Sequence, residues 1–236
     1  EPLGMGGIYF FVFGVLYKSA TDRHLGTAAD SYPLFLITGI FAWMWTNSAI
    51  SEATSALTGQ ARLITTMNMP REVFPIGRVS GRFAEYLAGL PILVTLAVVY
   101  ATRGEVRFGV WLLALPLAVL VQFTLLIGLA LLLSAVNVLM RDVERFMRLV
   151  TRVLFYATPI IYPLNLVRES AMPGWVKLGY ELNPLVGIFQ LHHATWYPDE
   201  FPEARLLAVS VGGSLAIFLI GWWAFRRLEP AVLKEL

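Results

Sequence analysis

Four charged side chains lie in or beside long apolar stretches of this chain, where an unpaired charge would be costly. Arg148 and Arg152 stand one helical turn apart at the start of one such stretch, and Glu52 and Glu85 lie near the ends of two others. Two arginines at this spacing can bind a phosphate or another anionic head group, and the carboxylates are candidate gating charges. Helix-end anchoring with snorkelled side chains would explain the same four residues.

Aromatic residues form a second set that could line a passage. Tyr9, Phe13 and Tyr17 follow an i, i+4, i+8 pattern, which places them on one face of a helix. Sugar rings stack their C–H faces on aromatic planes, so such a passage suits a carbohydrate. Packing between helices or against lipid would also use these rings. The candidate lining residues are Tyr9, Phe13, Trp43, Trp45, Phe155, Tyr156 and Tyr162.

The sequence shows no motif for enzyme chemistry. It contains no G-x-x-x-x-G-K-[ST] phosphate loop, no H-E-x-x-H and no G-x-S-x-G. Cysteine is absent, which excludes disulfides and thiolate metal sites. His192 and His193 are adjacent, so on a helix they diverge by about 100°, which favours an interfacial polar pair over a shared metal site. We expect no catalytic residue, no metal and no ATP hydrolysis in this chain.

The elements that must position these residues are membrane helices. Hydrophobic residues make up 57% of the chain and charged residues 14%, whereas soluble domains carry about 25% charge. About 20 apolar residues span a bilayer as a helix. An all-α membrane protein with six spans in one domain over residues 1–236 is therefore predicted. The stretches are Leu3–Tyr17, Pro33–Ser51, Phe83–Ala101, Gly109–Val136, Arg152–Leu166 with a start near Phe146, and Leu206–Phe225.

Charge predicts the orientation of these spans. Of the 18 Lys and Arg residues, eleven fall on one side and seven on the other, so the first side is expected to be cytoplasmic with both termini. Asn183–Tyr197 is too short to span and is expected to form a re-entrant or interfacial helix on the outer side.

Four segments together resemble the transmembrane permease subunit of ABC type-2 polysaccharide exporters, which include O-antigen, teichoic acid and galactan exporters. The resemblance covers essentially the whole chain. Family members place an amphipathic helix before the Glu-Pro that stands here at residues 1 and 2, so we expect that residues preceding Glu1 are missing. The segments are Thr65–Pro75 (TTMNMPREVFP), Ser134–Val143 (SAVNVLMRDV), Thr158–Pro163 (TPIIYP) and Leu182–Leu185 (LNPL).

The resemblance implies a homodimer in the bacterial plasma membrane that exports a polyprenyl-linked polysaccharide. Two copies of an ABC ATP-binding subunit would bind ATP and Mg, with no cofactor in this chain and no nucleic acid as partner. It also implies that Met69–Pro75 is a cytoplasmic coupling helix, where a plain basic loop is the alternative. The residues expected to contact the ATPase are Met69, Pro70, Arg71, Glu72, Phe74, Arg141 and Asp142.

Two other functions remain open at this stage. Related type-2 permeases export drugs or small lipids, and the Arg-rich composition only slightly favours a galactan as the polymer. The alternative hypothesis from a different functional class is a membrane acyl or glycosyl transferase. The absence of acid–base clusters argues against it.

Overall fold

The structure is a computed structural model, and it describes residues 31–66, 69–106 and 108–235. Every regular element in these ranges is a helix, as predicted. The order is α3 (Tyr32–Thr54), η3 (Thr58–Gln60), α4 (Ala61–Thr66), α5 (Val73–Thr102), η4 (Val110–Leu113), α6 (Ala114–Leu139), α7 (Val143–Tyr156), α8 (Leu164–Glu169), α9 (Gly174–Glu181), α10 (Pro184–Ala194), η5 (Pro198–Glu200) and α11 (Ala204–Glu235).

Four of the six predicted spans are confirmed as helices long and apolar enough to cross a membrane. They are Tyr32–Thr54, Val73–Thr102, Val110–Leu139 and Ala204–Glu235. α5 starts ten residues before the predicted stretch Phe83–Ala101, and α11 ends ten residues after the predicted stretch Leu206–Phe225. In both cases the helix continues through charged turns that hydropathy alone leaves out. The predicted first span, Leu3–Tyr17, lies outside the described residues.

α3 is the central helix of the bundle and packs against α5, α6, α7 and α10. Most of its residues are buried and apolar, as expected for a helix that others enclose over most of its circumference. The hydroxyls of Thr38, Thr46 and Thr54 donate to the carbonyl oxygens four residues earlier at 2.7–3.0 Å. These polar groups are therefore satisfied within the helix despite their burial.

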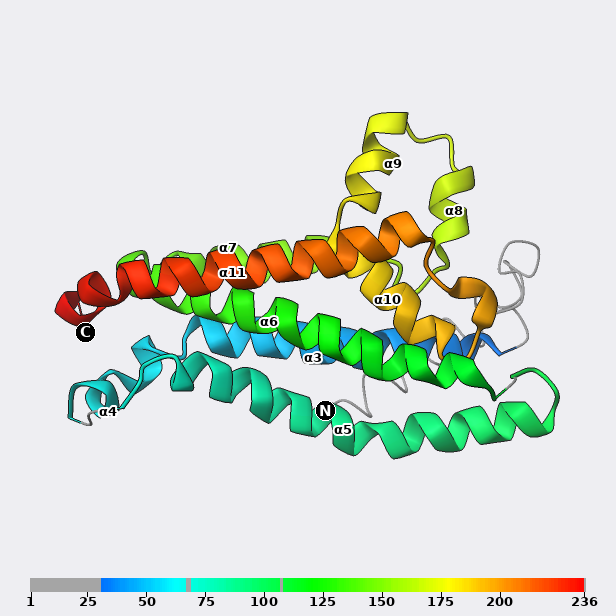
Figure 1. Cartoon of the computed structure of the whole chain (residues 1–236), viewed down its shortest axis with the longest axis horizontal. Coiled ribbons are helices and arrows are strands. Elements are labelled where there is room, and N and C mark those ends of the chain that lie inside the picture. The colour runs from blue at the N-terminus through cyan, green and yellow to red at the C-terminus, as the bar shows by residue number, and fades with distance from the viewer. Residues whose placement is uncertain (1–30, 67–68, 107, 236) are drawn as a thin grey trace.

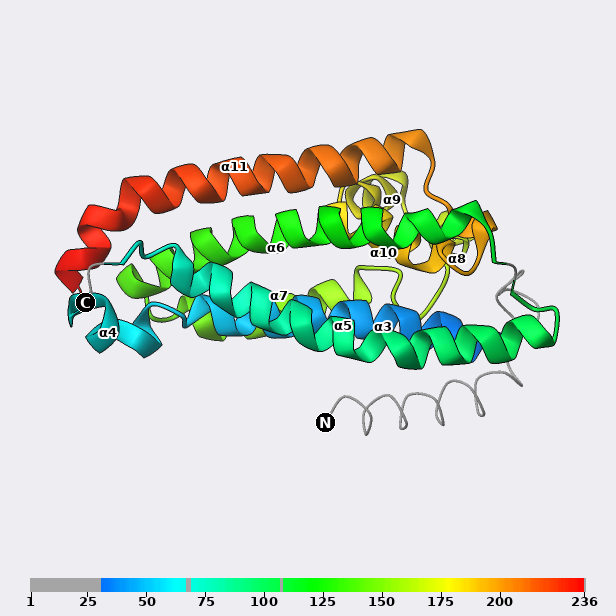
Figure 2. The same ribbon diagram turned by 60° about the horizontal axis from the view of Figure 1, so that its bottom comes forward.

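α6 and α11 approach each other closely at a pair of glycines. A Cβ atom on Gly221 would lie 2.0 Å from the carbonyl oxygen of Gly128, and a Cβ on Gly128 would lie 2.5 Å from Cα of Phe218. Small residues let membrane helices approach until their backbones touch. Figure 2 shows the two helices running side by side over most of their length.

The prediction of one continuous helix over Arg152–Leu166 is wrong. α7 ends at Tyr156, and the chain continues without helix until α8 begins at Leu164. Pro159 and Pro163 explain the break, because each removes a backbone donor and disfavours helix in the residue before it. Beyond the break, α8 and α9 stand away from the bundle, as Figure 1 shows.

α10 is buried among α3, α6 and α11 and does not lie on the surface of the bundle. Every residue from Leu185 to Ala194 is buried. Asn183 fixes the start of the helix: its Oδ1 accepts from the N–H of Leu185 at 3.1 Å, and its Nδ2 donates to the carbonyl of Ala157 at 3.1 Å. The side chains of His192 and His193, expected as an interfacial polar pair, are both buried inside the bundle.

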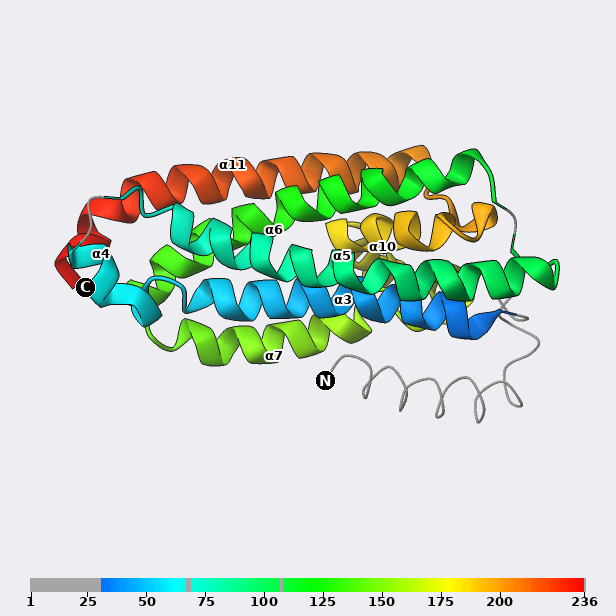
Figure 3. The ribbon, with the colours of Figure 1, turned by 90° about the horizontal axis from the view of Figure 1, so that it is seen from below.

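A compact coupling helix was expected between Pro70 and Pro75 or beside them; the structure has no separate helix between these prolines, and the short helix α4 lies beside them. α5 begins at Val73, which places Phe74 and Pro75 in its first turn. Proline is tolerated there because the first-turn N–H groups have no intrahelical partner. The short helix α4 precedes this segment. Figure 3 shows α4, the α6–α7 turn and the end of α11 together at one end of the bundle, which we call the α4 end.

Candidate functional site

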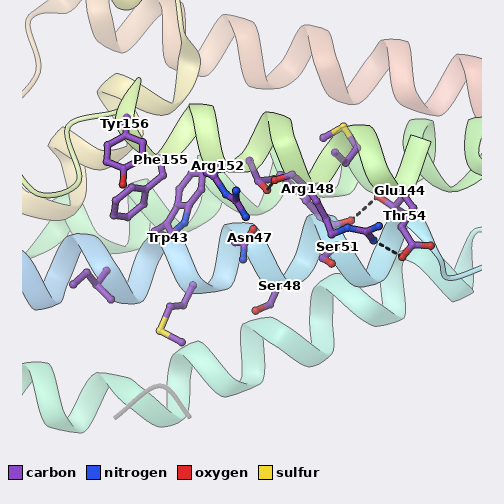
Figure 4. A pocket seen from close by; sticks show the side chains of 15 residues that line it. Trp43, Asn47, Ser48, Ser51, Thr54, Glu144, Arg148, Arg152, Phe155 and Tyr156 are labelled. Carbon is purple, nitrogen blue, oxygen red and sulfur yellow. Dashed lines mark hydrogen bonds and ion pairs between the residues drawn. The ribbon is translucent and has the colours of Figure 1, made fainter. Parts of the chain in front are cut away.

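A groove with a volume of about 580 Å³ runs between α3 and α7. It contains both kinds of residue that the sequence singled out, namely aromatic rings and a pair of arginines. Figure 4 shows the rings at one part of the groove and the two arginines further along the same helix, α7, with side chains of α3 opposite them. The lining residues are Ile40, Trp43, Met44, Asn47, Ser48, Ile50, Ser51, Thr54, Glu144, Met147, Arg148, Thr151, Arg152, Phe155 and Tyr156.

The aromatic part of the groove lies where α7 ends. Trp43 from α3 meets Phe155 from α7 edge to face, with ring centroids 5.6 Å apart. Phe155 meets Tyr156 in the same manner at 5.2 Å. Tyr156 is 66% exposed, whereas Trp43 is 8% exposed and rests on Phe189 of α10 at 6.3 Å. The two ends of this ring cluster are thus a fixed ring and an accessible one.

The charged part of the groove lies towards the α4 end. Arg148 donates to Glu144 at 2.8 Å across one turn of α7. Arg152, one turn further, makes no ion pair within the described ranges, and its side chain extends towards α3 beside Asn47 in Figure 4. An exposed (i, i+4) pair is worth only about 0.3–0.5 kcal/mol. Arg148 can therefore exchange Glu144 for another anion at small cost.

The polar side of α3 was missed in the sequence, although its spacing carried a signal. Asn47, Ser51 and Thr54 occur at i, i+4 and i+7, which puts them on one face of an otherwise apolar helix. All three line the groove opposite the arginines. A polar stripe of this kind in a membrane helix indicates a face turned to a cavity rather than to lipid.

Two predicted passage residues lie elsewhere. Trp45 packs between α5 and α6, with ring centroids 5.1 Å from Phe83 and Tyr86. Tyr162 lies in the break after α7, donates to the carbonyl of Tyr156 at 2.5 Å and accepts from Tyr180 at 3.2 Å. Burial raises the pKa of Tyr162, so its hydroxyl remains a donor. Tyr9 and Phe13 lie outside the described residues.

Glu52 and Glu85 both pair with Arg82 rather than with the arginines of the groove. Arg82 of α5 pairs with Glu52 of α3 and with both carboxylate oxygens of Glu85, at 2.6 and 2.7 Å for the latter. Arg82 and Glu85 line a second, smaller cavity of about 380 Å³ between α3 and α5. The two carboxylates thus share one compensating cation, but only Glu52 lies near a helix end, because α5 begins at Val73 and Glu85 lies inside it.

The residues expected to contact an ATPase lie at the α4 end, in two groups. Arg71 and Glu72 form ion pairs with Glu229 and Arg226 of α11, at 2.9 and 3.2 Å. Phe74 packs into the apolar cluster beneath them. The other residues are exposed: Met69, Pro70, Arg141 and Asp142.

Comparison with known proteins defines the class of this protein. The chain matches the family described as "ABC-2 type transporter" over residues 2–195. It therefore belongs to this family of transporter permeases, with several apolar helices typical of a multi-pass membrane protein.

The chain is similar to proteins named "O-antigen export system permease protein RfbA". The Myxococcus xanthus protein is 28% identical over 209 residues, which cover 86% of this chain and 76% of that protein. Two Klebsiella pneumoniae proteins of the same name are each 29% identical over 170 residues, or 72% of this chain. The matched region spans about three fifths of the length of these two relatives (61%).

Proposed function

We propose that this chain is the permease subunit of an ATP-driven exporter that moves a lipid-linked polysaccharide across a bacterial plasma membrane. Family membership and the names of the similar proteins support an exporter of this kind. The observation that carries the proposal is the groove between α3 and α7, which places a pair of arginines next to a set of aromatic rings.

The order of groups in the groove suits a polymer with an anionic lipid carrier. Arg152 has no ion-pair partner in the described part of the chain, and Arg148 is held only by Glu144, so both guanidinium groups can bind a phosphate. Sugar rings attached to that phosphate would then reach Trp43, Phe155 and Tyr156. Stacking on flat rings tolerates different units, as base stacking does at about 1–3 kcal/mol each, which lets a polymer slide.

Partner chains complete this function. Arg148, Arg152 and Tyr156 are exposed in the single chain, so a second copy could close the groove into a passage. ATP and Mg would be bound by two separate ATP-binding subunits beneath the α4 end. The exposed Met69, Arg141 and Asp142 offer a surface for them there, on the side that the excess of basic residues assigns to the cytoplasm together with both termini.

The groove arginines provide the test. The chain is reconstituted with its ATP-binding partner in vesicles that contain a polyprenyl-diphosphate-linked polysaccharide, and ATP-dependent export is measured. We expect R148Q/R152Q to lower export at least tenfold, because both phosphate contacts are lost. Arg145 is the matched control: it stands on the same helix with an 81% exposed side chain outside the groove, so R145Q should export normally.

Two outcomes would contradict the proposal. Export of polysaccharide by R148Q/R152Q at the wild-type rate would show that the polysaccharide does not pass through the groove. Export of a small lipid or drug, with no export of the polysaccharide by the wild-type complex, would favour the other branch of type-2 permeases.

A further inference from the structure

Two ion pairs connect the segment Met69–Pro75 to the last turns of α11, and the segment supplies the cation of one pair and the anion of the other. Arg71 Nη1 lies 2.9 Å from Glu229 Oε1, and Arg226 Nη2 lies 3.2 Å from Glu72 Oε1. Positive and negative charges are adjacent on the segment and one turn apart on the helix. Only one register therefore pairs both, since exchanging the partners would bring like charges together.

Apolar contacts beneath the ion pairs join the same elements. Phe74 and Ile76 pack against a buried cluster that includes Phe225 and Val232 of α11 and Leu131 of α6. The carboxylates are shielded, with the side chains of Glu72 and Glu229 only 19% and 24% exposed. The contact is thus an apolar patch covered by two partly screened charge pairs, and we call it the 71–229 clamp.

α11 connects this clamp to the interior of the bundle. Gly128 and Gly221 bring the backbones of α6 and α11 into contact, so these helices cannot slide past each other without separating. Further along, Gly187 of α10 is so close to α11 that a Cβ atom there would lie 2.4 Å from Ser210 Oγ. α10 in turn supports Trp43 of the groove through Phe189. A displacement at residues 71 and 72 therefore has a packed path to the groove.

We propose that Arg226 and Glu229 are positioning residues for energy coupling: through the 71–229 clamp they make the end of α11 move with the segment Met69–Pro75. The inference rests on the proposed function, in which an ATP-binding partner pushes on this segment. It assigns Arg71 and Glu72 a contact within the chain, rather than the contact with the partner that the sequence predicted. Within this segment, the surface left for the partner is then made by the exposed residues Met69 and Pro70, beside Arg141 and Asp142.

Charge-exchange variants distinguish a contact of Arg71 with α11 from a contact of Arg71 with the ATP-binding partner. In R71E and in E229R, like charges face each other and the clamp opens. In R71E/E229R, the pair is restored with opposite polarity. Ion pairs of this exposure change an equilibrium by about twofold to fivefold, so each single variant should export that much less polysaccharide per ATP hydrolysed. The double variant should recover wild-type coupling, whereas a direct contact of Arg71 with the partner would leave it as defective as R71E.

A control and a second measurement keep the result decisive. Arg227 is exposed beside Arg226 and makes no ion pair in the part of the chain that the structure describes, so R227E should couple normally. Backbone hydrogen exchange of residues 69–76 in the intact complex should rise in E229R and return in R71E/E229R. If E229R resembles R227E in both measurements, or if R71E/E229R stays defective, the clamp is refuted. If the wild-type complex exports no polysaccharide, the proposed function fails, and hydrogen exchange alone still decides whether the clamp exists.

Discussion

Trp43 and Phe155 meet edge to face with ring centroids 5.6 Å apart, and this contact joins α3 to α7 at the aromatic part of the groove. It also couples two roles, because Phe155 lines the groove while Trp43 rests on the buried helix α10. Edge-to-face pairs contribute about 0.5–1.5 kcal/mol beyond the area that they bury. Loss of either ring would therefore affect both helix packing and the passage, and a clean test needs a ring whose aromatic contact lies within one helix, as that of Tyr156 with Phe155 does.

Tyr156 is also 66% exposed and lines the groove. We predict that Y156A slows polysaccharide export severalfold while the amount of protein in the membrane is unchanged, since one stacking contact of about 1–3 kcal/mol is lost. Export and membrane abundance are measured together. Phe146 provides the control: it is 63% exposed on the same helix outside the groove, so F146A should leave the export rate unchanged. Equal rates for all three proteins would refute the stacking role of Tyr156.

The glycine contact between α6 and α11 predicts a different kind of defect. In G221A the new methyl group would overlap the carbonyl oxygen of Gly128, so the helices must separate. Overpacking of this kind costs about 1–3 kcal/mol, and the midpoint of thermal unfolding in detergent should fall. Gly212 stands on the same helix with nothing within 4 Å of its Cβ position, so G212A should unfold at or above the wild-type temperature. An unchanged midpoint in G221A would contradict this contact.

Sequence reasoning predicted the long helices well, because hydrophobicity and length alone determine which segments can span a membrane. It failed over Arg152–Leu166, where apolar character continues through the helix break. Pro159 and Pro163 carried the signal for that break, but hydropathy gave it no weight. Sequence reasoning also left open whether the segment containing α10 was re-entrant or interfacial, since burial depends on neighbours that are distant in the chain.

The candidate site was predicted in part. Trp43, Arg148, Arg152, Phe155 and Tyr156 all line one groove, whereas Trp45, only two residues from Trp43, faces the other side of α3. Residues two apart on a helix point about 200° apart, so treating both tryptophans as one lining set ignored the helical period. The partners of Arg71 and Glu72 were out of reach of local patterns, because they lie more than 150 residues away in the chain.

A buried hydrogen-bond chain around α10 predicts a stability effect far from the groove arginines. Gln122 Nε2 donates to the carbonyl of Ala42 at 2.9 Å and to Thr46 at 2.8 Å, so its Oε1 must accept from His192 Nε2 at 2.6 Å. His192 therefore carries its proton on Nε2, and its Nδ1 is free to accept from Tyr86. These bonds tie α10 to α3, α5 and α6.

Replacing the amide at position 122 should destabilise the bundle. In Q122L the N–H of His192 loses its acceptor while buried, which costs about 1–3 kcal/mol. Thermal unfolding in detergent measures the effect. Gln190 is the matched control, since its Oε1 is buried with no hydrogen-bond partner in the described residues, and Q190L should cost less. A smaller loss in Q122L than in Q190L would show that the chain around His192 does not hold α10.

The orientation of the bundle can be tested directly, because the chain contains no cysteine and a single introduced thiol is the only label site. Arg145 lies in the first turn of α7 at the α4 end, and Trp175 lies on α9, which projects from the bundle towards its other end (Figure 1). Both side chains are well exposed, at 81% and 77%. The excess of Lys and Arg at the α4 end predicts that this end is cytoplasmic. A membrane-impermeant maleimide should thus label W175C in intact cells, and R145C only after the membrane is opened or inverted. Labelling of R145C alone from outside would reverse the orientation and place the proposed ATPase surface on the wrong side of the membrane. Labelling of both positions from outside would show that the chain does not cross the bilayer between Arg145 and Trp175.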